Sequence, residues 1–421
     1  MPQTDQGSAS RASPGQAPPE LDERPALDEQ RARLRGLLQS KRTLVVAGPG
    51  GVGKTTTSAA FAVHAARLGL KVLVLTVDPA RRLATSLGLE GLGTEEVLID
   101  PALFRAEGVS LGEGGELHAM MLDVKSTFDA LIERHAPSPA VRDRIFANPF
   151  YEQASTVLAG SQEYMATEKL YELRSSRDYD LIVLDTPPTS NALDFLTASQ
   201  RLEDFLDSSA VRLMIQSART AGRLGLGFLR LNSLILKGLN RFIGASTFLN
   251  LLDFIESFHD MYAGFKDRAH EVREILRAPD AGFVIVSSTD GAALDEGLYF
   301  HGELRAHRMP FGAFLVNRVR TRRFAYGPPD DLASYLRERA LQVPALKLYD
   351  PARTALLTAR AAEACQDYDR LVRADARRLA SLRETLGEDA AAVCPVPLFD
   401  QDIHSLRGLA DFGDAVFGPV G

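Results

Sequence analysis

Residues 48–55 read Gly48-Pro49-Gly50-Gly51-Val52-Gly53-Lys54-Thr55, which is the G-x-x-x-x-G-K-[ST] pattern of a phosphate-binding loop. An apolar run rich in β-branched residues precedes it at 43–47, and a helix-like segment follows at 55–62. Glycines let the backbone curl so that its N–H groups point at phosphate oxygens, and the positive end of the helix dipole adds to the attraction. The order strand, glycine loop, helix therefore predicts phosphate binding rather than a glycine-rich turn that binds nothing.

The motif assigns roles to individual residues of the loop. Lys54 would reach the β- and γ-phosphates of a nucleotide, and the hydroxyl of Thr55 would ligate Mg²⁺. The predicted nucleotide-binding residues of this segment are Gly48, Gly50, Gly51, Val52, Gly53, Lys54, Thr55 and Thr56.

Two further apolar segments end in an acid. Residues 179–186 have the form of a Walker B strand, so Asp185 is predicted to hold Mg²⁺. Asp78 follows Leu75-Thr76-Val77 at the end of the second expected strand and could orient an attacking water, although an Asp-Pro pair after a strand is also a common turn. Neither Asn-Lys-x-Asp nor Thr-Lys-x-Asp occurs, which favours ATP over GTP.

Composition limits the class of protein. The 421 residues are 45% hydrophobic, enough for one large α/β domain with an insertion or for two domains. The net charge of −7 gives no indication of nucleic-acid binding. Two distant cysteines, Cys365 and Cys394, fit a reducing compartment, so we expect a cytoplasmic protein. Residues 1–28 lack periodicity and are predicted to be a disordered tail rather than a signal peptide.

The remaining chain, 29–421, predicts a doubly wound α/β fold with a mostly parallel sheet. The expected strands are 43–48, Lys71–Asp78, Leu181–Thr186, Phe283–Ser288, Phe311–Val319 and Ala345–Tyr349. Two stretches, 110–177 and 199–277, look helical and suggest an inserted helical subdomain, with one helix around Gln153–Arg174. A long helix is expected at about Arg353–Leu386. No uncharged run is long enough to span a bilayer.

Several motifs together resemble the ArsA-type ATPases, a family that includes the arsenite-pump ATPase and the cytosolic targeting ATPase for tail-anchored membrane proteins. The matching segments are residues 48–56, Asp78-Pro79-Ala80, Asp185–Thr189, Leu193–Leu196, Phe314–Arg318 and Val396–Phe399. The resemblance covers nearly everything after the tail. It implies a P-loop NTPase fold with the deviant Walker A motif of the ArsA/MinD-like class.

The resemblance also implies residue roles. Asp78 would belong to switch I and position the hydrolytic water, while Asp185 and the following 186–191 segment would form switch II. Asn317 matches the adenine-contacting Asn of the family, although taken alone it reads as a polar strand end. The loop expected at 396–399, including Pro397 and Leu398, matches the segment of the family that lies near the adenine.

The chain departs from the family pattern in three places. Members usually carry a second lysine after the first loop glycine, which reaches the ATP of a dimer partner, but Pro49 stands there. The metal-binding cysteines and duplicated half of the arsenite pump have no counterpart, and the Cys-x-x-Cys zinc clasp of the eukaryotic targeting factor is missing. Segment 158–166 looks like the bacterial branch, in which two ArsA-like chains often pair, so a homodimer or a heterodimer with a paralogue is expected.

A basic, apolar segment lies in the predicted insertion. Between Asp207 and Asp253 there is no acidic residue, and the cations are Arg212, Arg219, Arg223, Arg230, Lys237 and Arg241. The 208–252 region could receive a hydrophobic helix or a lipid, or lie on an anionic membrane surface, which would make the protein peripheral at the inner face of the membrane. The alternative is ordinary core packing with outward-pointing cations.

These observations favour an Mg²⁺-dependent ATPase that dimerises and acts as a conformational switch on a hydrophobic or membrane-associated client. The alternative is an ATP-binding, weakly catalytic partner of a lysine-bearing paralogue, which Pro49 supports. A partitioning ATPase is less favoured because such proteins generally lack a large basic helical insertion. Arsenite or anion efflux is less favoured because the thiols are missing. No nucleic-acid partner is expected.

Overall fold

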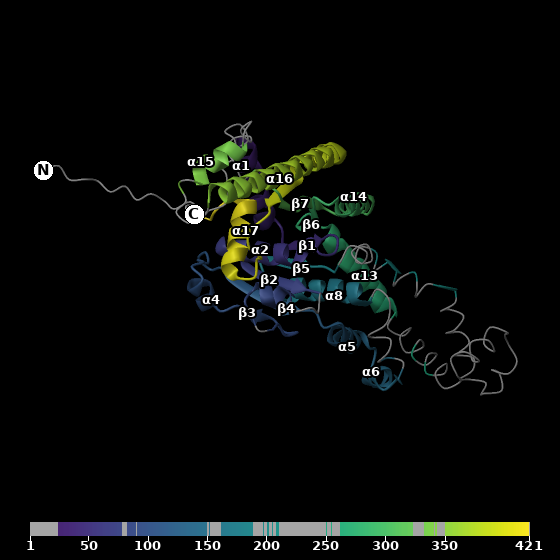
Figure 1. Cartoon of the computed structure of the whole chain (residues 1–421). Coiled ribbons are helices and arrows are strands. Elements are labelled where there is room, and N and C mark those ends of the chain that lie inside the picture. The colour runs from purple at the N-terminus through teal and green to yellow at the C-terminus, as the bar shows by residue number, and fades with distance from the viewer. Residues whose placement is uncertain are drawn as a thin grey trace.

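An eight-stranded β-sheet organises the protein, as the computed structural model shows (Figure 1). The strand order is β3-β4-β2-β5-β1-β6-β7-β8, and every pair is parallel except β3 with β4. The structure describes residues 24–77, 82–89, 91–149, 151, 161–187, 262–322, 332–340, 342 and 350–420, together with a few single residues between 197 and 254.

The strands are short and apolar. Their bounds are β1 Thr43–Ala47, β2 Lys71–Thr76, β3 Val97–Leu98, β4 Glu116–Met121, β5 Leu181–Asp185, β6 Ala281–Ser288, β7 Phe311–Val319 and β8 Val393–Pro397. All of β1 and β5 is buried, because helices cover both faces of the sheet. Successive residues point to opposite faces, so Leu44 and Val46 pack on one side while Val45 and Ala47 pack on the other.

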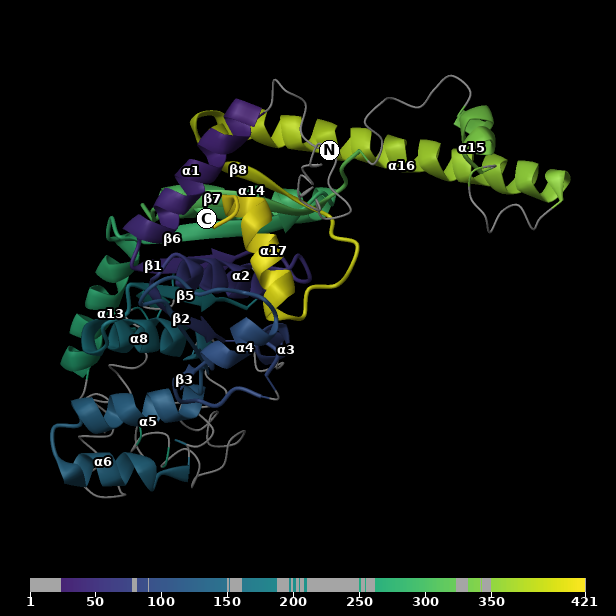
Figure 2. The same ribbon diagram turned by 90° about the vertical axis from the view of Figure 1, so that its left-hand side faces the viewer.

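Helices form a layer on each face of the sheet (Figure 2). The helices on the side of Leu44 and Val46 are α1 Arg24–Ser40, α2 Lys54–Arg67, α4 Pro101–Ala106 and α17 Leu406–Phe417. Those on the side of Val45 are α5 Val124–His135, α6 Pro139–Phe146, α8 Ser161–Ser176, α13 Tyr262–Arg277 and α14 Gly291–Ala306. The remaining elements are α3 Arg82–Ser86, α15 Leu332–Ala340, α16 Pro351–Leu386 and the 3₁₀ helix η3 Gly387–Ala392.

The predicted α/β fold with a mostly parallel sheet is confirmed. Five expected strands appear as β1, β2, β5, β6 and β7, with β2 ending at Thr76. The predicted strand Ala345–Tyr349 lies outside the described residues. The long helix is confirmed as α16, which begins after the N-cap Asp350, whose carboxylate accepts the N–H of Arg353 at 2.9 Å.

Three predictions need correction. Residues 116–121, inside the stretch predicted as helical, form strand β4, whose Leu117 and Ala119 pack in the core beside β2. Its Leu, Met, Glu and Ala residues favour helices, so tertiary packing overrides local propensity. Residues 393–397 form strand β8, so Val396 and Pro397 of the predicted 396–399 loop belong to a strand; its prolines are tolerated because it is an edge strand. Helix α1 overlaps residues 24–28 of the predicted tail.

The predicted helical insertion is described in part. Helices α5, α6, α8 and α13 lie in the two predicted ranges, and α8 covers the C-terminal part of the helix expected at 153–174. The basic 208–252 segment lies outside the described residues except for single positions. Within the described part of the chain, no helix has the length and apolar character needed to cross a membrane.

Candidate nucleotide-binding site

The phosphate loop connects β1 to α2 at the carboxyl edge of the sheet. Gly48 must be a glycine because a Cβ there would lie 1.9 Å from the carbonyl oxygen of Val286 in β6. Gly53 caps α2 with φ 99°, and a Cβ there would lie 2.5 Å from Nδ2 of Asn317. The close approach of the Val286 backbone explains the glycine at 48, and the positive φ together with the Asn317 side chain explains the glycine at 53.

Lys54 is buried at the start of α2. Its ammonium donates a hydrogen bond to the carbonyl oxygen of Pro49 at 2.9 Å, so the side chain folds back across the loop. A bound phosphate chain would compete for this ammonium, because a charge-assisted bond to an anion is stronger than a bond to a neutral carbonyl. The geometry fits the predicted role of Lys54 on the β- and γ-phosphates.

Asp185, the last residue of β5, is completely buried and joins three segments. One carboxylate oxygen accepts hydrogen bonds from the hydroxyls of Thr55 at 2.8 Å and Thr76 at 2.9 Å, and the other accepts from Ser58 at 3.3 Å. Burial raises the pKa of Asp185 to about 6, although the Thr55 and Thr76 hydroxyls and the charge of Lys54 favour the ionised form. This hydroxyl–carboxylate cluster ties α2 and β2 to β5.

The cluster fits a magnesium ion. Mg²⁺ prefers hard oxygen ligands, and Thr55 and Asp185 supply a hydroxyl and a carboxylate that already lie 2.8 Å apart. A bound cation would also stabilise the ionised carboxylate of Asp185, which burial disfavours. Thr76 and Ser58 would then orient the carboxylate rather than bind the metal themselves. Neither Thr76 nor Ser58 was singled out from the sequence.

The end of β7 contacts the backbone of the phosphate loop at Gly51 and Val52. Nδ2 of Asn317 donates to the carbonyl oxygen of Val52 at 2.9 Å, and its Oδ1 accepts the N–H of Arg318 at 2.9 Å. The guanidinium of Arg318 donates to the carbonyl oxygen of Gly51 at 3.2 Å. Arg318 adopts a positive φ of 59°, which is uncommon outside glycine. Sequence reasoning missed Arg318, although it directly follows Asn317.

The predicted adenine segment reaches the same edge. Pro397 pairs with Val319, and the N–H of Leu398 donates to the carbonyl oxygen of Val319 at 2.9 Å. The side chain of Leu398 is exposed beside this strand end. The fold thus brings Asn317, Pro397 and Leu398 to the edge that holds the loop, and their contact with a nucleotide stays a prediction.

Asp78, the predicted water-positioning residue, lies outside the described residues. Val77, the residue before it, donates its N–H to the carbonyl oxygen of Asp185 at 3.2 Å. The role of Asp78 stays a prediction. Thr56 is half-buried in the first turn of α2. The N–H groups of this turn have no carbonyl partner within the helix, so they point towards the phosphate loop.

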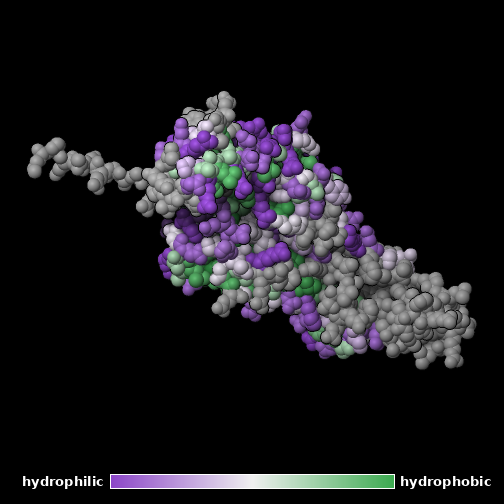
Figure 3. Space-filling view, in the orientation of Figure 1, coloured by the Kyte–Doolittle hydropathy of each residue, from purple (hydrophilic) through white to green (hydrophobic). Residues whose placement is uncertain are grey.

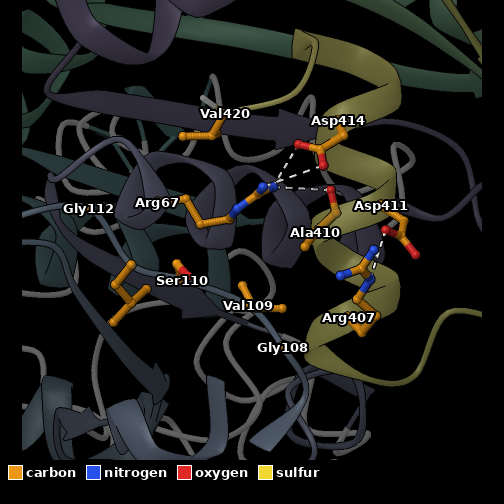
Figure 4. A pocket seen from close by; sticks show the side chains of 11 residues that line it. Arg67, Gly108, Val109, Ser110, Gly112, Arg407, Ala410, Asp411, Asp414 and Val420 are labelled. Atoms are coloured by element: carbon orange, nitrogen blue, oxygen red, sulfur yellow. Dashed lines mark hydrogen bonds and ion pairs between the residues drawn. The ribbon is translucent and has the colours of Figure 1, made fainter. Parts of the chain in front are cut away.

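A cavity of about 260 Å³ lies elsewhere, at the opposite end of α2 (Figure 4). Arg67 lines it and donates to Asp414 at 2.7 Å, and Arg407 pairs with Asp411 at 3.1 Å. Because α2 begins at the phosphate loop and is about 20 Å long, the cavity is separate from the nucleotide site. Both arginines are paired with acids, so neither offers a free cation to an anion.

The loop, the buried Asp185 cluster and the parallel sheet define a P-loop nucleotide-binding domain. Comparison with known families agrees: residues 41–324, more than half of the chain, match the family model described as anion-transporting ATPase. The chain belongs to this family, which confirms the resemblance to ArsA-type ATPases.

Individual relatives are fungal and bacterial. The chain is 31% identical over 186 residues to ATPase GET3 of Malassezia globosa, covering 42% of this chain and 49% of that protein. It is 31% identical over 183 residues to an uncharacterized protein of Streptomyces coelicolor, covering 43% and 42%. It is 30% identical over 161 residues to a putative arsenical pump-driving ATPase of Prosthecochloris vibrioformis, covering 38% and 36%. The chain thus spans about half or less of the length of these curated relatives.

Proposed function

We propose that this protein is an Mg²⁺-dependent ATPase that works as a conformational switch. The observation that carries the proposal is the buried carboxylate of Asp185, which accepts hydrogen bonds from Thr55 of the loop helix and Thr76 of β2. Asp185 is the first residue of the predicted switch II, and β2 is followed by the predicted switch I. A change of metal or γ-phosphate at this carboxylate would therefore act on both segments at once.

The proposed reaction is in-line attack of water on the γ-phosphate. Lys54 and the loop N–H groups would stabilise the charge that develops on the phosphate oxygens, and Asp78 would orient the water. Thr55 and Asp185 would hold Mg²⁺, which when bound neutralises charge on the β- and γ-phosphates. Asn317, Pro397 and Leu398 would form the adenine side of the site.

The helical layer supplies a mechanical connection for the switch. Helix α8 leads into β5, the strand that ends in Asp185. Within α8, the buried Glu168 accepts a hydrogen bond from Arg268 of α13 at 2.9 Å, and the Arg268 guanidinium stacks on the Tyr171 ring at 3.6 Å. A shift of β5 as a whole would therefore be transmitted through α8 to α13, which follows the basic segment in the chain.

The proposed output is handling or targeting of a hydrophobic or membrane-associated client through residues 208–252, by a member of the bacterial branch of the family. The basic, acid-free composition of this segment supports an anionic or apolar partner.

We expect replacement of Arg230, Lys237 and Arg241 by Glu to reduce binding to vesicles containing anionic lipid by at least about 10-fold, since each cation near such a surface contributes about 1 kcal/mol. Vesicle co-sedimentation measures this. The matched control replaces three exposed cations elsewhere, Arg105, Arg305 and Arg308, by Glu. Equal loss in both variants, or no loss in the first, would contradict a role for the segment.

A second candidate function rests on Pro49. Proline offers no charge where the family usually has a lysine that reaches across a dimer. On this account the chain binds ATP but depends on a lysine-bearing paralogue for turnover. Hydrolysis by the isolated chain distinguishes the two candidates.

Arg318 supplies a further test of the proposed nucleotide site. We expect Arg318→Ala to weaken ATP binding by about 10-fold, because it removes a cation and a loop contact worth about 1–2 kcal/mol. Fluorescence titration with an ATP analogue measures the affinity. Arg308→Ala is the matched control: it is also an exposed arginine with positive φ, 56°, but it precedes β7 at the other end of the strand. Equal affinities for the two variants would argue against the assignment.

A further inference from the structure

Helix α16 extends far beyond the sheet. Its C-terminal part packs on the domain through Leu379, Leu382 and Leu386, all buried. At Asp375 it is fixed to the end of β7, because this buried carboxylate accepts the N–H of Arg320 at 3.1 Å and pairs with its guanidinium. Residues 351–374 continue past this point for about 36 Å, with α15 packed alongside (Figure 2). We call this part of α16, with α15, the arm.

The arm lies outside the region that the family model matches, which ends at residue 324. Four of the large hydrophobic side chains that are exposed on the described surface belong to it: Tyr335, Leu356, Leu357 and Leu371. In Figure 3 hydrophobic residues appear among hydrophilic ones in the upper part of the molecule, where α15 and α16 lie.

One face of the arm carries a regular apolar stripe. Its members follow alternating spacings of four and three residues: Leu357, Ala361, Ala364, Tyr368 and Leu371. Asp375, Leu379, Leu382 and Leu386 follow at intervals of three or four residues on the same side of the helix, so the stripe is the extension of the face that packs on the domain. In the arm, Leu357 is 45% and Leu371 46% exposed, and Ala361 and Ala364 are exposed as well. This stripe has the pattern of a helix-pairing seam.

Two charges flank the stripe in a self-complementary arrangement. Arg360 and Asp367 lie seven residues apart at equivalent positions on one side of it. If a second α16 ran antiparallel, with a two-fold axis between residues 362 and 363, each Arg360 would face the Asp367 of the other copy. The exposed Asp367 also pairs with Arg370 at 2.9 Å, which leaves lone pairs for a second cation.

The same register brings four of the five stripe residues opposite one another, while Leu371 would lie opposite Thr354. Ala361 would face Ala364 of the second copy, and these small side chains permit close approach at the axis. Leu357 would face Tyr368 of the second copy, so large side chains would meet on either side of the two-fold axis. One symmetric arrangement would therefore bury the apolar side chains and also pair the opposite charges.

We propose that the arm pairs with the arm of a second copy of this chain through the Leu357–Leu371 stripe. The inference rests on the dimerisation that belongs to the proposed function, and it assigns that dimerisation a surface. Because the arm projects from the end of β7, next to Asn317, the carboxyl edges of the two sheets face each other along the paired helices. The phosphate loops of both copies lie on those facing edges.

The first test changes one leucine at a time. We expect the wild-type chain to sediment as a dimer with Mg²⁺–ATP, and Leu357→Glu to weaken self-association by about 100-fold, because it places an uncompensated charge in the seam. Leu356→Glu is the matched control: Leu356 is 55% exposed but lies off the stripe, and this variant should remain dimeric. Equal behaviour of the two variants, or a monomeric wild type, would overturn the proposal.

The second test exchanges the charges. Arg360→Glu or Asp367→Arg alone should weaken the dimer, because like charges then face each other, and the double variant should restore it. Restoration identifies antiparallel self-pairing, which an unrelated partner would not produce; additive losses would overturn it. ATP binding by each variant separates the two proposals, since the stripe lies outside the nucleotide site. Normal dimers without nucleotide binding would contradict only the proposed function.

Discussion

Asp185→Asn should abolish Mg²⁺-dependent ATP hydrolysis and make the nucleotide-free protein more stable. Turnover should fall by about 1,000-fold, because an amide oxygen carries no charge with which to hold the metal. Stability should rise because the folded protein buries the carboxylate completely, while the hydroxyls of Thr55, Thr76 and Ser58 can still bond to an amide. A residue that costs stability and is needed for activity is the expected signature of a functional site.

The sign of the pH dependence follows from the pKa of Asp185, which burial raises from 3.8 to about 6 in the folded, metal-free protein. A raised carboxyl pKa means that ionisation costs folding free energy above pH 6, and that this cost disappears as the pH falls from 6 towards 4. The Asn variant should therefore exceed the wild type by about 3 kcal/mol at pH 7 to 8, and the difference should vanish near pH 4.

Urea denaturation of both proteins between pH 4 and 8, in the presence of a metal chelator, measures this difference. Ser58→Ala serves as a comparison that removes a hydroxyl partner but keeps the carboxylate, and it should be less stable than the wild type at pH 7. A less stable Asn variant at pH 7 would show that the carboxylate is compensated in the folded protein.

Gly48→Ala should have the second large effect. A Cβ at this position would lie 1.9 Å from the carbonyl oxygen of Val286, a backbone atom that cannot move without disturbing the pairing of β6. We expect a loss of about 3 kcal/mol in the free energy of unfolding and at least about 10-fold weaker nucleotide binding, because the loop must shift.

Gly50→Ala is the matched control, because a Cβ at Gly50 meets nothing within 4 Å. Thermal melting and nucleotide titration of the two variants provide the measurement. The control should keep its folding stability within about 0.5 kcal/mol of the wild type. Equal stability of both variants would mean that the approach of Gly48 to Val286 does not constrain the loop.

The most local patterns in the sequence predicted the fold and the residues at the centre of the candidate site, whose role stays a prediction. The loop motif and the apolar runs of β1 and β5 carry their information within a few residues, and Asp185 ends such a run. Thr76 and Ser58 were missed because their role appears only when β2, α2 and β5 meet. Ser58 did have one signal: it lies three residues after Thr55, and therefore on the same face of α2.

The missed strands have physical reasons as well. Strand β4 is built from residues that favour helices, and β8 contains two prolines, so neither resembles a strand in isolation. Arg318 was overlooked because its contact with Gly51 depends on the backbone at φ 59°, which no sequence pattern specifies. Helix α16 was predicted from its sequence pattern, but the apolar stripe on its arm could be recognised only once the fold showed where the domain ends.

The most direct test of the account is ATP hydrolysis by the purified chain alone, with Lys54→Ala as the blank. We predict Mg²⁺-dependent turnover that the substitution abolishes, because the ammonium at the mouth of the loop would no longer stabilise the transferring phosphoryl group. Such a result would identify an ATPase that does not need a lysine at the position of Pro49. Tight binding of Mg²⁺–ATP without turnover above the blank would contradict this account and direct the search to a lysine-bearing partner chain.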